Sequence, residues 1–306
     1  MKKKVVVLMG GFSVEREVSL TSAQGVLQAL QELGHEAIPL DVTRNMGDLV
    51  ESLRAHTPDV VLNILHGRWG EDGCIQGLLE MMDIPYSHSG VLGSALAMNK
   101  VVARKICEIH GIRISEGYVA KFSDVCAGRV MTPPFVIKPI GEGSSLGVHI
   151  VLDGKTPLPK PEEWVFEDDI LVERYISGRE IQVAVLDGKA IGAIEIRPHS
   201  GFYDYEAKYT DGKATHLMPA PIHEEAYAQV LAWAEKAHKA LECRGVSRSD
   251  FRYDDTKGEP GQLYYLETNP QPGLTPLSLV PEIAAHAGMS YSQLVQWMIE
   301  DSSCHR

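Results

Sequence analysis

The first ninety residues alternate apolar runs with amphipathic stretches, and this order constrains the fold more than any other feature of the chain. Val5–Met9 is an apolar run that ends at Gly10-Gly11, as expected of a buried parallel strand. Residues 20 to 33 then carry apolar side chains on one helical face, and Gly34 follows where a C-terminal cap belongs. The same strand-then-helix order recurs twice before residue 90. It predicts a parallel sheet whose loops gather at the carboxyl edge.

The loops expected at that edge are Gly10–Glu17 and His66–Gly73, and a ligand is expected there. Beyond them we predict one helix from about Ser94 to His110 and then a mixed region of strands and helices. Asp187-Gly188 predicts a hairpin turn between two of these strands. The expected fold class is therefore α/β followed by α+β, arranged in two lobes.

Charge and cysteine content exclude several classes of protein. The 306 residues include 41 acidic and 29 basic ones, for a net charge of −12, whereas a general nucleic-acid binder needs a basic surface. The five cysteines are scattered and form no C-x-x-C pair, which is typical of a reducing cytoplasm without disulfides or a zinc site. No uncharged apolar run approaches the roughly 18 residues that span a bilayer. We expect a soluble cytoplasmic protein with no nucleic-acid or membrane partner.

The glycine-rich segment Gly141–Gly147 is open to three interpretations. Gly143–Gly147 matches G-x-S-x-G, but residues 148–151 read as a strand rather than the helix that a hydrolase nucleophile elbow requires. A phosphate-binding hairpin fits better, because glycine N–H groups and two serines follow Lys138 at a strand end. A flexible surface hairpin is the third possibility. Neither G-x-G-x-x-G nor a Walker loop occurs in the chain.

Polar residues recur at alternate positions on two late strands. Alternation places Arg248 and Asp250 on one face of the first strand, and Glu267 and Asn269 on one face of the second. If the two strands pair, their hard oxygen ligands suit Mg²⁺ or Mn²⁺. The alternative is an exposed sheet face with cross-strand ion pairs.

Taken in order, these and other short motifs resemble the D-alanine–D-alanine ligase family. The matching segments are Gly10-Gly11 with Ser13, Glu15–Ser19, His66-Gly67, Gly70–Gly73, Lys100, Lys138-Pro139, Glu142–Ser145, Phe202–Tyr209, Arg248–Asp250, Glu267–Asn269, Pro272–Thr275 and Ser278–Pro281. The resemblance covers nearly the whole chain. It implies the ATP-grasp fold with an N-terminal parallel-sheet domain at 1–95, a central lobe at 96–180 and a C-terminal lobe at 181–306.

The resemblance also implies a reaction and its site. ATP phosphorylates the carboxylate of one D-alanine, and the amine of a second D-alanine attacks the acylphosphate, a step that supplies peptidoglycan precursors. The residues implied for nucleotide binding are Lys100, Lys138, Glu173, Ile176, Glu180, Phe202 and Lys208. Those implied to hold two Mg²⁺ or Mn²⁺ ions are Asp250, Glu267 and Asn269. Those implied for substrate binding and catalysis are Glu15, His66, Ser144, Tyr209, Arg248, Gly273 and Ser278.

The chain departs from the family pattern at two positions. Arg174 stands where a lysine is frequent, and Pro270 replaces the threonine that commonly follows the metal asparagine. Proline has no N–H, so a substrate contact through that amide is not expected. Tyr209 after Lys208 is the form found in dipeptide-forming members, and the family is commonly dimeric. The alternatives are another ATP-grasp carboxylate ligase, using a different amino acid or hydroxy acid, and a non-catalytic nucleotide-binding sensor.

Overall fold

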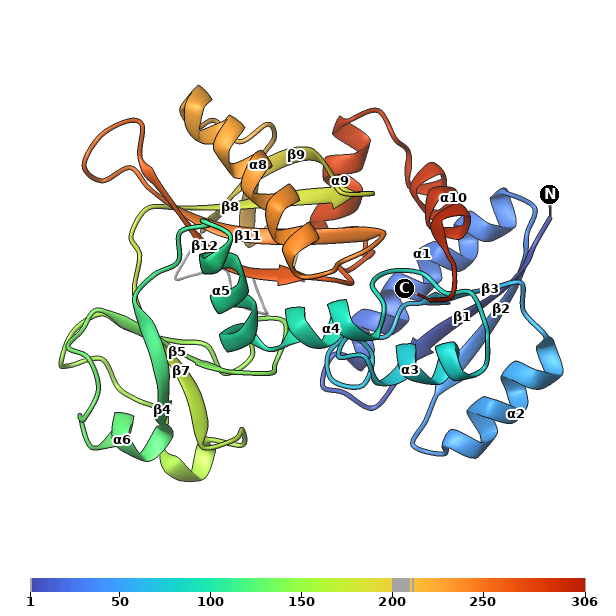
Figure 1. Ribbon diagram of the computed structural model, residues 1–306, viewed down its shortest axis with the longest axis horizontal. Helices are drawn as coiled ribbons and strands as arrows, with labels where there is room; N and C mark the ends of the chain where they lie inside the picture. Colours follow the sequence, from blue (N-terminus) through green and yellow to red (C-terminus); the bar gives the residue numbers. More distant parts are fainter. Residues whose placement is uncertain (1, 200–209, 211, 306) are drawn as a thin grey trace.

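The computed structural model describes residues 2–199, 210 and 212–305, and its first sheet is the predicted parallel one (Figure 1). Its strands lie in the order β2-β1-β3, and both pairings with β1 are parallel. The elements of this part are β1 (Lys4–Gly10), α1 (Arg16–Glu32), β2 (Glu36–Val42), α2 (Met46–His56), β3 (Val60–Asn63) and α3 (Cys74–Met81). The alternation of apolar runs and amphipathic stretches therefore predicted this layer correctly.

A four-stranded antiparallel sheet follows and has its own small core. Its strand order is β4-β7-β5-β6, and the elements are β4 (Gly117–Lys121), α6 (Phe122–Cys126), β5 (Phe135–Pro139), β6 (His149–Val151), the 3₁₀ turn Pro161–Glu163 and β7 (Asp169–Arg174). Phe122 packs there with Ile137 and Val172. β5 and β6 pair as the predicted hairpin, so residues 140–148 form the loop between them.

A five-stranded antiparallel sheet completes the architecture. Its strand order is β10-β9-β8-β11-β12, and the elements are β8 (Arg179–Leu186), β9 (Lys189–Pro198), β10 (Ala214–Leu217), α8 (Glu224–Ala240), β11 (Val246–Asp254), β12 (Gln262–Asn269), α9 (Leu279–His286) and α10 (Tyr291–Asp301). Asp187 and Gly188 form the predicted turn, with φ of 47° and 70°. The parallel α/β layer followed by two antiparallel sheets with helices agrees with the expected fold class, α/β followed by α+β.

The predicted single helix from Ser94 to His110 was wrong. The chain forms α4 (Val91–Met98) and α5 (Lys100–Ile109), with Asn99 between them in an extended conformation. The Asn99 side chain accepts a hydrogen bond from Val102 N at 3.1 Å, which caps a new helix. Sequence reasoning also missed β4, α6, β10 and α9, which are short.

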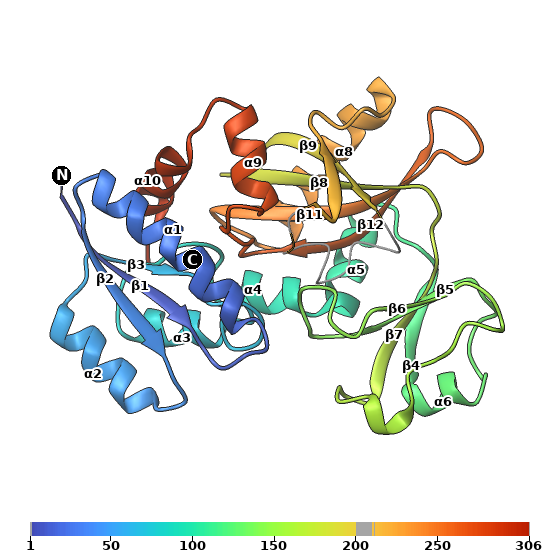
Figure 2. The ribbon, with the colours of Figure 1, turned by 180° about the vertical axis from the view of Figure 1, so that it is seen from behind.

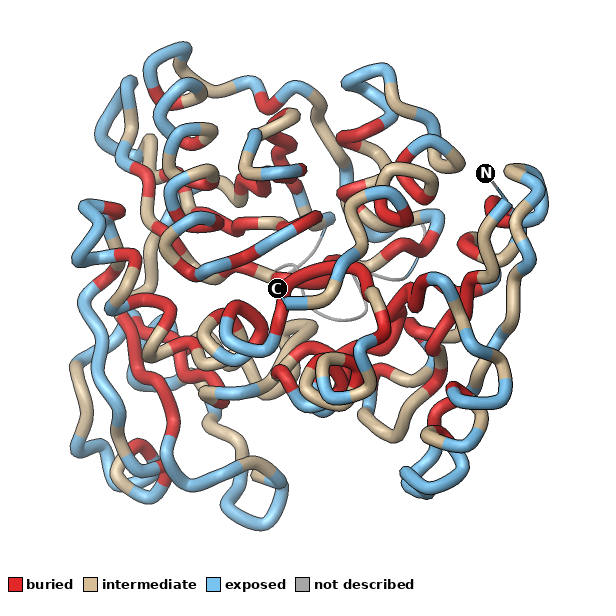
Figure 3. The backbone as a smooth tube through the Cα atoms, turned by 45° about the vertical axis from the view of Figure 1, so that its right-hand side comes forward, coloured by how far each residue is buried: buried red, intermediate tan, exposed pale blue. Residues whose placement is uncertain are grey.

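The first and the five-stranded sheets share one hydrophobic core, whereas the four-stranded sheet stands apart (Figure 2). Residues of α10 pack with α1 in that shared core, for example Leu294 with Leu30, so the chain end returns to the first sheet. The buried residues of these layers lie mainly on the strands (Figure 3). Boundaries near residues 95 and 180 stay a prediction. None of the helices described is both long and apolar enough to cross a membrane.

Candidate active site

A cleft of about 840 Å³, counting the solvent at its mouth, lies between the two antiparallel sheets, and we call it the intersheet cleft. Predicted nucleotide and metal residues line it from both sides, namely Lys100, Lys138, Glu173, Ile176, Glu180, Asp250 and Glu267. The apolar side chains of Val136, Leu146, Ile150 and Leu266 line it as well. A concave site lined mostly by apolar side chains, with a few polar or charged groups, is the usual construction of a small-molecule site.

Glu173 on β7 is the centre of a buried ion cluster within this cleft. One carboxylate oxygen contacts Lys138 Nζ, and the other contacts Arg104 Nη1 and accepts from Ser115 Oγ at 3.1 Å. Burial alone would raise the pKa of the Glu173 carboxyl, but the charges of Lys138 and Arg104 outweigh burial and hold that pKa below its ordinary value. Both oxygens are therefore engaged with protein groups, and Glu173 fixes Lys138 in place.

Lys100 reaches the cleft from the first turn of α5. Its Nζ donates to the Glu142 carbonyl oxygen in the β5–β6 loop and lies 3.3 Å from Glu267 Oε2 on β12. Because the helix breaks at Asn99, α5 begins at Lys100. The Asn99 cap, which the sequence prediction missed, therefore also fixes the position of Lys100 in the first turn. The Lys100 ammonium group thus connects α5, the β5–β6 loop and β12.

The two late strands pair with each other, and the faces that alternation predicted come together. Asp250 lies opposite Glu267 and Arg248 opposite Asn269, so all four share one face of the sheet. Arg248 holds Asp250 through two hydrogen bonds, of 2.8 Å and 2.9 Å. Two carboxylates and an amide oxygen gathered at one end of a cleft are a donor set that suits Mg²⁺.

A second pocket adjoins the cleft and shares Lys100, Glu142 and Glu267 with it; we call it the adjoining pocket. The predicted substrate and catalytic residues that line it are Glu15, His66, Ser144, Arg248 and Gly273, and the predicted metal residue Asn269 lines it as well. Its residues come from the first sheet's loops, from the β5–β6 loop and from the end of β12. Three sheets therefore contribute to one pocket.

Glu15 lies between two loops in this pocket. Its carboxylate accepts a hydrogen bond from Ser144 Oγ of the β5–β6 loop. A Cβ atom on Gly67 would lie 2.5 Å from Glu15 Oε2 and one on Gly143 would lie 2.9 Å from it, so both loops approach the carboxylate closely. The β5–β6 loop thus closes directly onto the first sheet.

His66 presents a buried ring to the same pocket. Its Nδ1 lies 2.9 Å from Glu71 Oε1, while its Nε2 has no hydrogen-bond partner among the residues described. Burial acts to lower the pKa of His66, but Glu71 and Glu15 outweigh burial and raise it overall. The adjoining pocket therefore holds a ring nitrogen that is available to a ligand.

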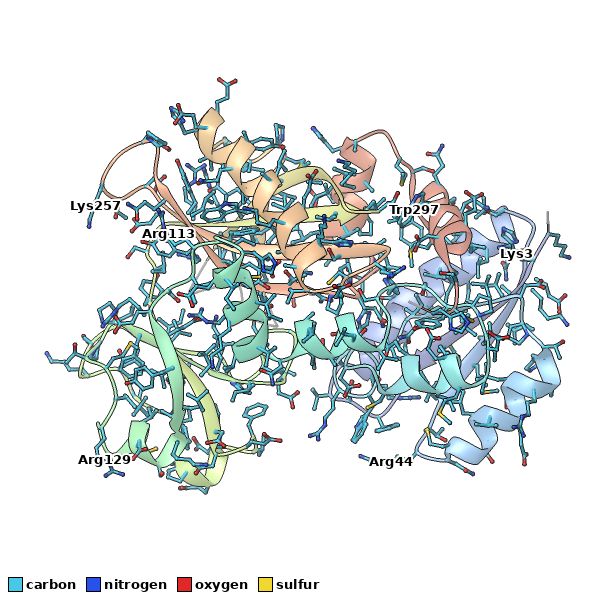
Figure 4. All side chains as sticks on the ribbon, viewed as in Figure 1. Lys3, Arg44, Arg113, Arg129, Lys257 and Trp297 are labelled. Carbon is cyan, nitrogen blue, oxygen red and sulfur yellow. The ribbon has the colours of Figure 1, made fainter. Side chains whose placement is uncertain are left out.

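The other predicted residues lie at the edge of this arrangement or beyond it. Ser278, the N-cap of α9, accepts from Thr275 N at 2.9 Å and lies beside Gly273, but it does not line the adjoining pocket. Phe202, Lys208 and Tyr209 lie outside the described residues. The labelled cations Arg44, Arg129 and Lys257 lie at the outer edges of the molecule (Figure 4).

Sequence reasoning missed Arg104 and Ser115, which complete the Glu173 cluster. Arg104 is four residues after Lys100 and three before Cys107, so it lies on the buried face of α5. A second basic residue on the buried face of a helix, beside Ala103 and Cys107, could have marked a buried ion pair. Ser115 lies in a loop and gave no such pattern.

Two antiparallel sheets that face each other across a cleft are the architecture of the ATP-grasp class of enzymes. Two family models narrow this class, since the D-ala D-ala ligase C-terminus matches residues 116–300 and the D-ala D-ala ligase N-terminus matches residues 47–89. The chain belongs to the D-alanine–D-alanine ligase family.

Individual relatives agree over the full length. The D-alanine–D-alanine ligases of Paramagnetospirillum magneticum and Methylocella silvestris are each 51% identical to this chain, covering 99% and 100% of it and all of both relatives. A crystal structure of D-alanine–D-alanine ligase from Bacillus anthracis complexed with ATP superimposes with a TM-score of 0.80 at 32% identity, over 98% of this chain and 97% of that one. The VanG D-Ala:D-Ser ligase from Enterococcus faecalis reaches 0.78 at 29% identity, over 98% and 99%.

Proposed function

We propose that this protein uses ATP to join two molecules of D-alanine into D-alanyl-D-alanine through a D-alanyl phosphate, as a supplier of peptidoglycan precursors. One observation carries the proposal: the intersheet cleft and the adjoining pocket share Lys100, Glu142 and Glu267. A phosphoryl group at the end of a nucleotide in the cleft would therefore face a small substrate in the pocket. Family membership and relatives about half identical over their full length support the same reaction.

The nucleotide occupies the intersheet cleft in this proposal. Lys138 and Lys100 bind its phosphates, and Ile176 and Glu180 at the start of the five-stranded sheet contact its base and sugar. Glu173 acts through Lys138, because both of its oxygens are already paired with protein groups. Phe202 and Lys208 are proposed as further nucleotide contacts from the family motif alone.

Asp250, Glu267 and Asn269 are the residues that would hold Mg²⁺ or Mn²⁺. Their register brings two carboxylates and one amide to the point where cleft and pocket meet, and hard oxygen donors fit these ions. Bound there, the divalent cations neutralise negative charge on the phosphates of the nucleotide.

The adjoining pocket holds the reacting D-alanine. Glu15 binds its ammonium group, and Arg248 faces its carboxylate. A carboxylate oxygen of D-alanine attacks the γ-phosphorus of ATP, and ADP leaves with the electron pair of the broken P–O bond. The amine of the second D-alanine, as the free base, then attacks the acyl carbon, and inorganic phosphate leaves from the tetrahedral intermediate. Arg248 stabilises the oxyanion of that intermediate.

The acylphosphate must be protected from water while it waits for the amine. The contact between Ser144 and Glu15 places the β5–β6 loop over the adjoining pocket, so this loop is suited to exclude solvent. Tyr209 is proposed to strengthen this closure. Ser278 and Gly273, which lie beside each other, are proposed to hold the second substrate's carboxylate.

We further infer a homodimer and the three-domain division at residues 95 and 180. The first turn of α4 exposes Val91 and Leu92, by 40% and 58%, and a second copy of the chain is a suitable cover for such apolar side chains.

Phosphate release from ATP tests the proposal. The purified protein with Mg²⁺ is expected to release phosphate with D-alanine and only at background with L-alanine or no amino acid. D-Lactate or D-serine offered beside D-alanine is expected to contribute little to the product at neutral pH. An excess of the mixed product would show that the preferred second substrate is D-lactate or D-serine rather than D-alanine. Equal phosphate release without any amino acid would show that the protein only hydrolyses the nucleotide.

A further inference from the structure

A buried network of side-chain amides lies behind the adjoining pocket and is not part of its lining. Its members are Asn63 at the end of β3, Gln76 on α3 and Gln271 after β12, and none is more than 1% exposed. Gln271 is 208 residues from Asn63 in sequence, yet Asn63 Nδ2 donates to Gln271 Oε1 at 2.7 Å. The network therefore joins the first sheet to the strand that carries Glu267 and Asn269.

Each bond of the network ends next to a residue that lines the pocket. Gln271 Nε2 donates to the carbonyl oxygen of Leu65, the neighbour of His66. Asn63 Nδ2 and Gln76 Nε2 donate to the carbonyl oxygen of Gly70, the neighbour of Glu71, at 2.9 Å and 2.8 Å. On the other side, the Gln271 backbone N–H donates to Asn269 Oδ1 at 2.8 Å.

From these contacts we infer that Gln271, paired with Asn63, is a positioning residue that sets the separation of the two sides of the adjoining pocket. The inference rests on the proposed function, since it assigns D-alanine to that pocket. One side carries His66 and Glu71, and the other carries Asn269 and Gly273. Gln271 is bonded to both sides, through its side chain to Leu65 and through its backbone N–H to Asn269. Pro270 has no N–H, so the backbone amide that fixes Asn269 is supplied one residue later, by Gln271.

The network is separate from the intersheet cleft. None of Asn63, Gln76 and Gln271 lines that cleft, and Lys138 and Glu173 are held by their own ion cluster. A change at Gln271 should therefore alter D-alanine binding without a matching change in ATP binding. A residue needed only for general stability would affect both substrates through the amount of folded protein.

Gln271→Met tests the inference, because methionine keeps the length of the side chain and removes its donor and acceptor. The apparent KM for D-alanine at saturating ATP is expected to rise about tenfold, because the variant loses both hydrogen bonds that the buried Gln271 side chain makes. The KM for ATP is expected to change by less than about twofold, because the cleft keeps its contacts. Gln296→Met is the matched control, since Gln296 also links distant parts of the chain, with Oε1 2.9 Å from His35 Nε2, but lies far from the pocket on α10.

A second variant covers the case in which Gln271→Met does not fold. Asn63→Ser shortens the partner side chain, and it is expected to raise the same KM selectively. The double variant is expected to raise the KM for D-alanine by less than the product of the two single effects, because both substitutions remove the same Asn63–Gln271 hydrogen bond. Equal increases in both KM values, or an unchanged KM for D-alanine in folded variants, would overturn the positioning role. Wild-type protein without D-alanine-dependent turnover in the same assay would instead overturn the proposed function.

Discussion

The intersheet cleft and the adjoining pocket are built in opposite ways. The charged centre of the cleft is a compact cluster in which Glu173 holds Lys138 and Arg104, and all three side chains are buried. The pocket depends on contacts between loops far apart in sequence, such as Ser144 with Glu15. The comparison teaches that the charged centre of the cleft depends on the stability of one buried cluster, whereas the pocket depends on how separate sheets meet.

Glu173→Gln should have the largest effect on stability. Glutamine leaves two buried cations without their anion, which costs about 3–5 kcal/mol in the free energy of unfolding. The pKa of this carboxyl is lowered by folding, so its stabilising effect is present above the ordinary value of about 4.5 and is lost as pH falls through the lowered folded value. Denaturant unfolding of both proteins should show a difference that is full at pH 7 and narrows below about pH 4.5. A constant difference down to acid pH would contradict the charge argument.

Glu267→Gln should reduce turnover by at least about a hundredfold while the fold persists, because it removes an anionic ligand of the divalent cations that would neutralise the transferring phosphate. Circular dichroism should match the wild type, and steady-state phosphate release should show the loss. Glu300→Gln on the exposed face of α10 is a control of the same chemistry. Wild-type turnover in folded Glu267→Gln would remove this residue from the metal site.

Glu15→Gln should act on the pocket alone. Loss of one partner of a buried charge pair is expected to raise the apparent KM for D-alanine by about thirtyfold. ATP affinity measured by calorimetry should stay near the wild-type value, because Glu15 does not line the cleft. Weakened ATP binding of the same size would mean that the cleft and the pocket do not function separately.

Ser144→Ala should give the smallest effect. It removes the hydrogen bond that the loop donates to Glu15, which contributes about 1 kcal/mol and corresponds to roughly a fivefold rise in the same KM. Hydrogen exchange in residues 141–147 should become faster in this variant with ATP and D-alanine present. Exchange identical to the wild type would show that this contact does not hold the loop closed.

The same contrast explains what could be predicted from the sequence. The faces shared by Arg248 with Asp250 and by Glu267 with Asn269 follow from alternation over short stretches, and the β5–β6 hairpin follows from its glycines. The Asn63–Gln271 contact spans 208 residues and depends on how two sheets pack, so no local pattern contained it. The break at Asn99 was overlooked because apolar residues on both sides favour one continuous helix, while a single side-chain cap divides it. The roles of Phe202, Lys208 and Tyr209 stay predictions.

The proposed D-alanyl phosphate requires that an oxygen atom passes from D-alanine to phosphate, and isotope transfer measures this directly. D-Alanine labelled with ¹⁸O in its carboxylate is incubated with the protein, ATP and Mg²⁺, and the dipeptide and inorganic phosphate are analysed by mass spectrometry. The account predicts one labelled oxygen in each phosphate for each D-alanyl-D-alanine formed, because the carboxylate oxygen that attacks phosphorus leaves with it. Unlabelled phosphate beside the dipeptide would contradict the D-alanyl phosphate and, with it, the proposed alignment of the two sites.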